Sequence, residues 1–411
     1  MNLTFAEALL ILGALLAAAA ALSGWFRGTV LSISVLSVVT GVGLALLDVV
    51  DVNSGAESVV FLVELALILT LFSDGLFVES ELLRRHWGPP ARALVLAMPL
   101  TLVLLALAGK ALFPELTWTE AFLLGAVLSP TDPVVTSAVV TSRRVPRVIR
   151  HTLNLESGLN DGLALPFVLF FLALATAEGS PGGEAARLTG EAVAGALIGI
   201  ALAFVAARLL PRLPGGGMEP KYEGTYALGL GLLAFGLADV TYGNGLIAAF
   251  VAGIALAAAR HDIPEAFQEF NESVSAVFQI GTFFVFGALI VATGWNHSVW
   301  PLLVFIAFAL LVARPAAVLL SFLGVTMPAP HKLFIAWFGP KGVASMLFAL
   351  LVLNSTTRDR TLVFDIASFV ILTSILAHGL TDTVGARWIE RRLGPSVDRE
   401  DYDVGEGVER A

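Results

Sequence analysis

Residues 154–175 read NLESGLNDGLALPFVLFFLALA, a polar stretch that runs without interruption into one of the most apolar segments of the chain. A helix over this segment is long enough to cross about 30 Å of hydrocarbon at about 1.5 Å per residue. The whole sequence is 57% hydrophobic and only 14% charged, unlike the composition of soluble domains. The segment therefore predicts a membrane-spanning helix that begins with costly polar groups.

Apolar runs of similar length recur along almost the whole chain and predict an all-α polytopic membrane protein with about thirteen transmembrane helices. The predicted spans are residues 5–24, 29–48, 57–78, 91–110, 118–140, 152–176, 188–209, 223–241, 245–259, 272–292, 299–323, 333–354 and 362–385. The span at 245–259 is short, so twelve spans are an alternative. We expect one transmembrane domain over residues 1–393 and a short disordered tail at 394–411, which is polar and acidic.

Lysine and arginine are distributed unequally between the two sides of this arrangement. Most of them fall in loops on one side, such as 79–90, 141–151 and 210–222. By the positive-inside rule, this side is cytoplasmic. We therefore expect a multi-pass protein of the plasma (inner) membrane, with its N-terminus outside and its C-terminus in the cytoplasm. The absence of cysteine excludes disulfides and thiol catalysis.

Two of the predicted spans contain helix breakers. The fifth span has Pro130 and Pro133 around Thr131-Asp132, and the twelfth reads FGPKG at 338–342. Proline removes a backbone donor, and irregular backbone at membrane depth is tolerated only where protein or a water-filled cavity covers it. These breaks are either ordinary proline kinks in packed helices or the discontinuous helices of an ion site.

The positions of the two breaks favour the second interpretation. They lie seven spans apart, as equivalent elements of two inverted repeats would, at about 1–176 and 223–385. An odd offset gives the repeats opposite orientations in the membrane. Many secondary transporters have such repeats, with the ion site where paired discontinuous helices meet.

The polar groups at the start of the sixth span lie on one side of a helix, at 100° per residue. They include Glu156, Ser157, Asn160 and Asp161. Burial favours a protonated aspartic acid and a bound cation favours the carboxylate, so a proton and a cation would compete for Asp161. Hard cations prefer oxygen ligands, which the Ser157 hydroxyl and freed carbonyls near Thr131 could supply. The alternative is that Asp161 only caps or braces a neighbour.

Two further charged residues, Lys341 and Asp132, have candidate roles. Lys341, deep in the broken twelfth span, is a plausible partner for Glu156, in an ion pair that would orient the sixth span against the twelfth. Asp132 could cap the second half-helix of the fifth span or attract the cation. Both roles of Asp132 stay open at this point.

These residues resemble the monovalent cation:proton antiporters of the sodium/proton exchanger branch, the NhaP/NHE type, over residues 1 to about 390. The motifs that carry the resemblance are SPTDPVV (129–135), ESGLNDG (156–162), ADVTYGNGLIAAFVAGI (238–254), ARP (313–315) and WFGPKGVASMLFAL (337–350). The resemblance implies a homodimer in the lipid bilayer whose protomers contain two crossing broken helices. It implies alternating access, no catalytic residue and no cofactor. The substrates would be H⁺ and a monovalent cation, Na⁺ foremost, with Li⁺ or K⁺ as alternatives; no nucleic acid partner is implied.

The resemblance also assigns roles to single residues. Asn160-Asp161 matches the signature pair of electroneutral exchangers, with Asp161 as the transporting aspartate, and Ser157 and Thr131 match cation ligands. Glu156 matches the acidic half of a core ion pair, and Arg314 a buried arginine that braces the core.

The chain departs from the family pattern at two places. In the third span many relatives have an acidic cation ligand where this chain has Ser73, and Asp74 follows in LFSDG (71–75). Lys341 stands where arginine is common, which keeps the charge but loses the bidentate fork. Whether Asp74 or Ser73 faces the ion is open, and with it the choice between Na⁺ and K⁺.

Two other function classes compete with antiport. An intramembrane aspartyl protease would need a second catalytic aspartate and a glycine directly before the first, where this chain has Asn160. An uncoupled cation channel, or a scaffold without transport, could share the antiporter fold.

Overall fold

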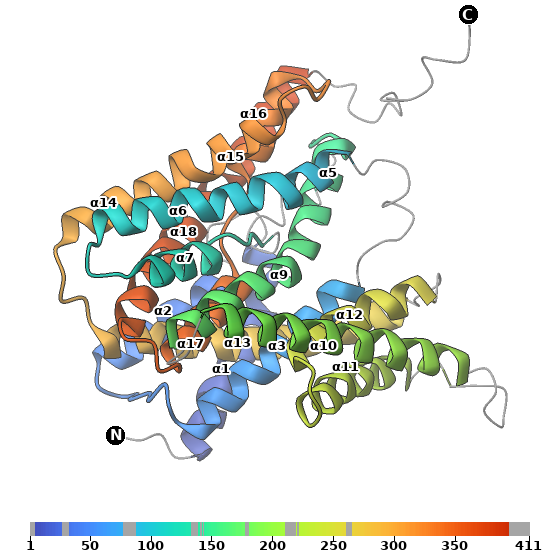
Figure 1. Ribbon diagram of the computed structural model, residues 1–411. Coiled ribbons are helices and arrows are strands. Elements are labelled where there is room, and N and C mark those ends of the chain that lie inside the picture. Colours follow the sequence, from blue (N-terminus) through green and yellow to red (C-terminus); the bar gives the residue numbers. More distant parts are fainter. Residues whose placement is uncertain are drawn as a thin grey trace, which may run out of the picture.

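The computed structural model of the chain describes residues 5–26, 33–76, 88–132, 139, 142, 144–176, 181–209, 219, 222–259 and 265–393. Every element within these ranges is a helix (Figure 1). The helices are α1 (Phe5–Phe26), α2 (Ile33–Leu46), α3 (Glu57–Leu76), α5 (Gly88–Arg92), η1 (Ala93–Ala97), α6 (Met98–Leu112), α7 (Trp118–Val127), α9 (Arg147–Thr176), α10 (Pro181–Leu209), α11 (Glu223–Asp239), α12 (Gly245–Ala259), α13 (Glu265–Thr293), α14 (Val299–Phe308), η5 (Ala309–Ala313), α15 (Arg314–Ser321), α16 (Ala329–Trp337), α17 (Val343–Leu353) and α18 (Arg360–Leu393). The all-α membrane fold is confirmed.

Among the described residues, six helices are long and apolar enough to cross a membrane. They are Glu57–Leu76, Gly88–Leu112, Arg147–Thr176, Ala185–Leu209, Val299–Ser321 and Arg360–Arg392. The other predicted spans coincide with α1, α2, α11, α12 and α13 or contain one of the two breaks, so their total number stays a prediction. The tail at 394–411 and most of the seam at 210–222 lie outside the described residues.

We expected the polar residues at 154–161 to lie at the start of their helix, but they do not. α9 begins at Arg147, directly after Pro146, whose carbonyl accepts from the amides of Ile149 and Arg150. Proline suits this place because the first helical turn has no use for its missing donor. Asp161 therefore lies several turns inside a long helix rather than in its first two turns.

Two π-helical turns occur at matching places. η1 directly precedes Met98-Pro99, and η5 directly precedes Arg314-Pro315. A proline inside a helix lacks a donor and crowds the carbonyl four residues before it, and a wider turn relieves both problems. The sequences ALVLAMP (93–99) and ALLVARP (309–315) are nearly the same, which is a sequence sign of repetition that our reading missed.

Close helix crossings show a second correspondence between the halves. α2 packs on α13 and α3 packs on α12, through glycines that press against a backbone carbonyl of the partner helix. The contacts are Gly41 with Phe284, Gly287 with Val38, Gly253 with Phe72, and Gly75 with Phe250. One constant offset in residue number converts the first pair of contacts into the second pair. A pseudo-twofold relation between the two halves accounts for this pattern.

Both predicted breaks fall where regular helix ends. α16 ends at Trp337 and α17 begins at Val343, with irregular backbone between them. α7 ends at Val127, and Ser129–Asp132 continue without helix. Most of the fifth span beyond Asp132 lies outside the described residues, so its second half-helix, and the crossing of two broken helices, stay predictions.

The helices next to the two breaks pack against one another. In Figure 1, α6 and α14 lie side by side across the upper part, and α10, α11 and α12 gather at the lower right. α7 packs on α9, and α17 packs on α18 and α3. These contacts bring the two breaks and the polar part of α9 together.

Candidate ion-binding site

Glu156 forms an ion pair with Arg314, not with Lys341 as we expected. The Nη1 of Arg314 lies 2.6 Å from Oε1 of Glu156, and Nη2 lies 3.2 Å from Oε2. Both side chains are buried, with 8% and 4% exposure. The planar guanidinium can engage both carboxylate oxygens, which an ammonium cannot do in the same geometry. The prediction of a Glu156–Lys341 pair was therefore wrong in its partner, and the bracing role expected for Arg314 includes this pair.

Arg314 also explains why the twelfth-span break has a glycine at its second position. A Cβ atom on Gly339 would overlap the guanidinium of Arg314. Nη2 of Arg314 donates to the carbonyl of Ile335 at 3.4 Å, which ties the side chain to α16. Arg314 thus connects α15, α9 and the end of α16.

Lys341 binds the other break instead of a carboxylate. Its Nζ donates to the carbonyl of Pro130 at 3.1 Å and to that of Ser129 at 3.4 Å. These carbonyls lie just past the end of α7, where backbone acceptors lack intrahelical donors and the helix dipole is negative. The charge of Lys341 therefore stabilises the irregular backbone of the fifth span.

Asp132 makes the reciprocal contact to the twelfth span. Its Oδ2 accepts from the amide of Val343, the first residue of α17, at 3.0 Å, and its own amide donates to the carbonyl of Pro340 at 2.9 Å. A Cβ atom on Gly342 would overlap this carboxylate. Asp132 thus accepts a hydrogen bond at the N-terminus of α17, whose own N-cap residue is Gly342. The cap predicted for the second half-helix of its own span falls outside the described residues and stays a prediction, as does its role in attracting the cation.

Asn160 joins α9 to the fifth-span break. Its Nδ2 donates to the hydroxyl of Thr131 at 2.7 Å and to the carbonyl of Thr131 at 3.0 Å. Oδ1 of Asn160 is enclosed and has no hydrogen-bond partner among the described residues. Asn160 therefore fixes the place of Thr131 relative to the next residue along α9, Asp161.

Asp161 faces a second carboxyl group. The side chains of Asp161 on α9 and Asp74 on α3 lie within hydrogen-bonding reach of each other. Asp161 is buried, and one enclosed oxygen of each group, Oδ1 of Asp161 and Oδ2 of Asp74, has no partner among the described residues. Two carboxylates at such a separation repel each other unless a proton or a cation lies with them. Asp74, whose orientation the sequence left open, thus belongs to the site.

The other predicted ligands lie close by along the chain. Ser157 is buried one helical turn before Asp161, and Thr131 is buried at the break. Ser73 is buried next to Asp74 on α3. The structure therefore collects hydroxyl, carbonyl and carboxylate oxygens from α3, α9 and the fifth-span break, a donor set suited to a hard cation.

Our reading of the sequence missed two polar residues of α18. Ser374 Oγ accepts from the amide of Lys341 at 2.9 Å, and His378 lies one turn later with a ring nitrogen 2.9 Å from the carbonyl oxygen of Trp337. Both side chains are buried. Polar residues four apart in an otherwise apolar span were a detectable signal, because such groups seldom face lipid.

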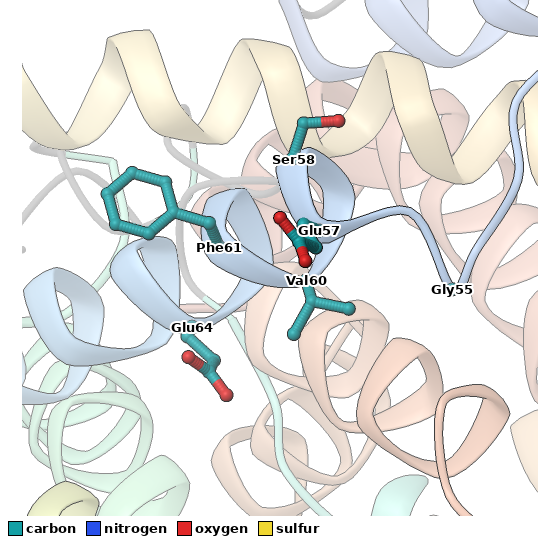
Figure 2. A pocket seen from close by; sticks show the side chains of 6 residues that line it. All are labelled: Gly55, Glu57, Ser58, Val60, Phe61 and Glu64. Carbon is teal, nitrogen blue, oxygen red and sulfur yellow. The ribbon is translucent and has the colours of Figure 1, made fainter.

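An open pocket of about 540 Å³ lies elsewhere, at the start of α3. Figure 2 shows its lining side chains along the first turns of this helix, Glu57 and Glu64 among them. Glu64 is about 15 Å from Asp74 along the helix axis at 1.5 Å per residue. The pocket is therefore separate from the carboxyl pair.

Within the described residues no group of three or more histidine, aspartate or glutamate side chains could hold a metal ion together.

Comparison with known proteins gives one family and several relatives. The family model described as "Sodium/hydrogen exchanger, transmembrane" matches residues 11–385. The K⁺/H⁺ antiporter NhaP of Alkalimonas amylolytica is 26% identical over 338 residues, which cover 81% of this chain and 58% of that protein. The Na⁺/H⁺ antiporter of Schizosaccharomyces pombe is 28% identical over 347 residues, covering 72% and 70%. The chain thus spans 58% of the length of several curated relatives.

The fold has a solved counterpart. The structure of the sodium proton antiporter MjNhaP1 from Methanocaldococcus jannaschii superposes with a TM-score of 0.78 at 21% identity. The match covers 93% of this chain and 98% of that one. At this identity the similarity concerns the fold.

Proposed function

Because the chain belongs to the sodium/hydrogen exchanger family, we propose that it exchanges a monovalent cation for a proton across a membrane by alternating access. Asp161 is the residue that carries one or the other. Ser157, Thr131 and Asp74 supply further oxygens to the cation. Asn160 holds Thr131 in place, and Asp132, Lys341, Glu156 and Arg314 form the support around the two breaks.

One observation carries this proposal: the adjacent carboxyl groups of Asp161 and Asp74. With both ionised, the pair needs a positive charge, which either a proton or a cation supplies. The two ligands therefore exclude each other at one place. Mutual exclusion at a site that opens alternately to each side is sufficient for coupled exchange.

Competition of a proton and a cation for one carboxyl pair also supports electroneutral exchange. If one proton or one monovalent cation satisfies the pair, the loaded site carries the same charge in both directions of travel. An imposed membrane potential should then leave the exchange rate unchanged. A potential-dependent rate would instead indicate that the two carboxyl groups carry more than one proton per cation.

The transported ion is proposed as Na⁺, with K⁺ as the second candidate. Both are hard cations that oxygen ligands bind. The relatives' names support each choice: one relative is a K⁺/H⁺ antiporter and another a Na⁺/H⁺ antiporter. Li⁺ is the third ion to test.

We also propose the arrangement in which this exchange takes place. The protein is a homodimer in the plasma (inner) membrane. Its N-terminus lies outside and its C-terminus in the cytoplasm, and the distribution of lysine and arginine supports this orientation. Its inverted repeats are residues 1–176 and 223–385. The matched π-helical turns and the matched glycine crossings support these repeats.

Proteoliposomes with an imposed pH gradient and an internal pH-sensitive dye test the function. Addition of Na⁺, Li⁺ or K⁺ to wild type should collapse the gradient, and Asp161→Asn should not. Glu191→Gln, which alters an exposed ion pair with Arg187, is the control and should behave as wild type.

Two results would contradict the proposal. No response of well-folded wild type to any of the three cations would remove antiport. Cation flux without proton movement would point to an uncoupled channel in the same fold.

A further inference from the structure

His378 lies on α18, and its side chain faces the end of α16, the first helix of the twelfth span. Its ring is 2% exposed and stacks on the ring of Trp337, the last residue of α16, with 5.0 Å between centroids and 29° between planes. Nδ1 is 2.7 Å from the carbonyl oxygen of Ser374, and Nε2 is 2.9 Å from that of Trp337. The ring therefore has a carbonyl acceptor on each side.

This geometry depends on the charge of the ring. A neutral imidazole has one N–H, so it can donate to only one of the two carbonyls, and the lone pair of its other nitrogen then faces an oxygen. The Ser374 hydroxyl, 3.2 Å from Nδ1, can donate to that nitrogen when it is unprotonated, but the carbonyl oxygen of Ser374 lies closer. Only the imidazolium donates to both carbonyls at once.

The charged groups near the ring come from several elements. Arg314 of α15 and Lys341 of the break are the two cationic groups that act on it. On α18 itself, Asp382 lies one turn after His378. From α16, Lys332 donates to the carbonyls of Phe322 and Val325 rather than toward the ring. His331, near the start of α16, is the other titratable group of that helix. A protonated ring at this place would be repelled by two cations.

The contacts continue from His378 to the ion-binding segment. Ser374, which lies against the ring, accepts from the amide of Lys341 through its hydroxyl. The ammonium of Lys341 donates to the carbonyls of Ser129 and Pro130, next to Thr131. A change in how His378 holds α16 therefore reaches the break that binds the fifth span.

We propose that His378 is a positioning residue for the exchange reaction: the protonated ring fastens the end of α16 to α18 through both carbonyls, and the neutral ring fastens only one. The maximum rate of exchange then follows the charge of this ring, separately from the competition of proton and cation at Asp161. This inference rests on the proposed function. It adds a second proton-sensitive group that does not touch the transported ion.

The test compares His378→Gln with Thr381→Val. Thr381 Oγ1 accepts from Nε1 of Trp337 at 3.0 Å, so it joins the same two elements through a bond that does not titrate. The maximum rate at saturating cation and the apparent KM are measured in proteoliposomes between about pH 4 and 8, a range that extends below the one in which an ordinary histidine changes charge.

We expect the ratio of wild-type to H378Q maximum rates to change by about fivefold over this range, the factor of one net hydrogen bond. The KM profiles should stay parallel. In T381V both profiles should keep the wild-type shape.

A second readout does not need transport. The difference in Tm between wild type and H378Q in detergent should change with pH over the same range, because protonation changes both the charge and the hydrogen bonds of a buried ring. His378→Asn serves as a second neutral variant where H378Q does not fold. Parallel rate profiles together with a pH-independent difference in Tm would overturn the inference while leaving antiport intact. Absence of cation-driven proton movement in wild type would instead contradict the proposed function itself.

Discussion

At the scale of single residues, the candidate site contains two kinds of charged group, a buried ion pair and a pair of carboxyl groups. Glu156 and Arg314 satisfy each other in a buried ion pair. Asp161 and Asp74 face each other, and one enclosed oxygen of each has no hydrogen-bond partner among the described residues. A paired charge is fixed, whereas a carboxyl pair must bind a counter-charge from solution.

The first prediction concerns the fixed pair. Glu156→Gln leaves a buried guanidinium without its counter-charge and should lower the free energy of unfolding by on the order of 3–5 kcal/mol. Thermal unfolding in detergent measures this loss. Glu191→Gln breaks an exposed pair with Arg187 and should cost no more than about 0.5 kcal/mol. Equal melting temperatures for the two variants would contradict the structural role of Glu156.

The second prediction concerns the carboxyl pair. Asp74→Asn removes one of its two negative charges, so the apparent affinity for the cation should fall by at least about tenfold, since even second-shell changes cost that much. The fold should be retained, because an amide has nearly the same volume. Isothermal titration with Na⁺ and K⁺ measures the effect, and Ser73→Ala is the neighbouring control. A larger loss in the Ser73 variant would place Ser73, not Asp74, among the ligands.

At the scale of elements, the two breaks brace each other. Lys341 of the twelfth span supplies donors to the carbonyls after α7, and Asp132 of the fifth span supplies an acceptor to the start of α17. Each charge lies at the helix end that its sign stabilises. The backbone of each break is therefore satisfied by a side chain of the other break, as buried backbone requires.

The third prediction follows from the cap. Asp132→Ala removes both the acceptor and the charge at the start of α17 and should cost about 0.5–2 kcal/mol, the usual range for a lost N-cap. Asp132→Asn keeps an oxygen that can accept from Val343 and should cost less. Thermal unfolding of both variants decides between the two contributions. An equal loss in both would show that the charge, and not the hydrogen bond, stabilises α17.

Much of this arrangement could be predicted from local sequence, and some of it could not. The apolar runs indicated the helices, and the proline and glycine clusters indicated the breaks. The partner of Glu156 could not be chosen, because Lys341 and Arg314 are both cations in spans of similar depth. Only the packing of α15 against the break, which Gly339 permits, decides it. Asp74 was ambiguous for a related reason, since one residue of helix rotation changes which side chain of LFSDG faces α9.

At the scale of the whole molecule, the pseudo-twofold relation makes alternating access plausible in physical terms. Halves that repeat the same crossings can exchange an inward-facing and an outward-facing arrangement by similar motions. The glycine crossings of α2 with α13 and of α3 with α12 keep backbones in contact, so these helices should move as units. The breaks and α9 would carry the ion between the two arrangements.

The fourth prediction is the pH dependence of transport. Because a proton and a cation compete for one carboxyl pair, a falling pH protonates the pair and raises the apparent KM for the cation, by about tenfold per pH unit once the protonated form dominates. Rising pH removes this effect, and KM becomes constant. Initial exchange rates in proteoliposomes at several cation concentrations measure it. A KM that stays constant while the maximum rate changes would place the pH dependence outside the binding site.

The central claim, that one proton and one cation replace each other at Asp161 and Asp74, has a direct measurement. Purified protein in weakly buffered detergent solution is titrated with Na⁺ or K⁺ while the released protons and the heat of binding are recorded. The account predicts close to one proton released per cation bound in wild type, and neither heat nor protons in Asp161→Asn. Cation binding that releases no proton at any pH would contradict it.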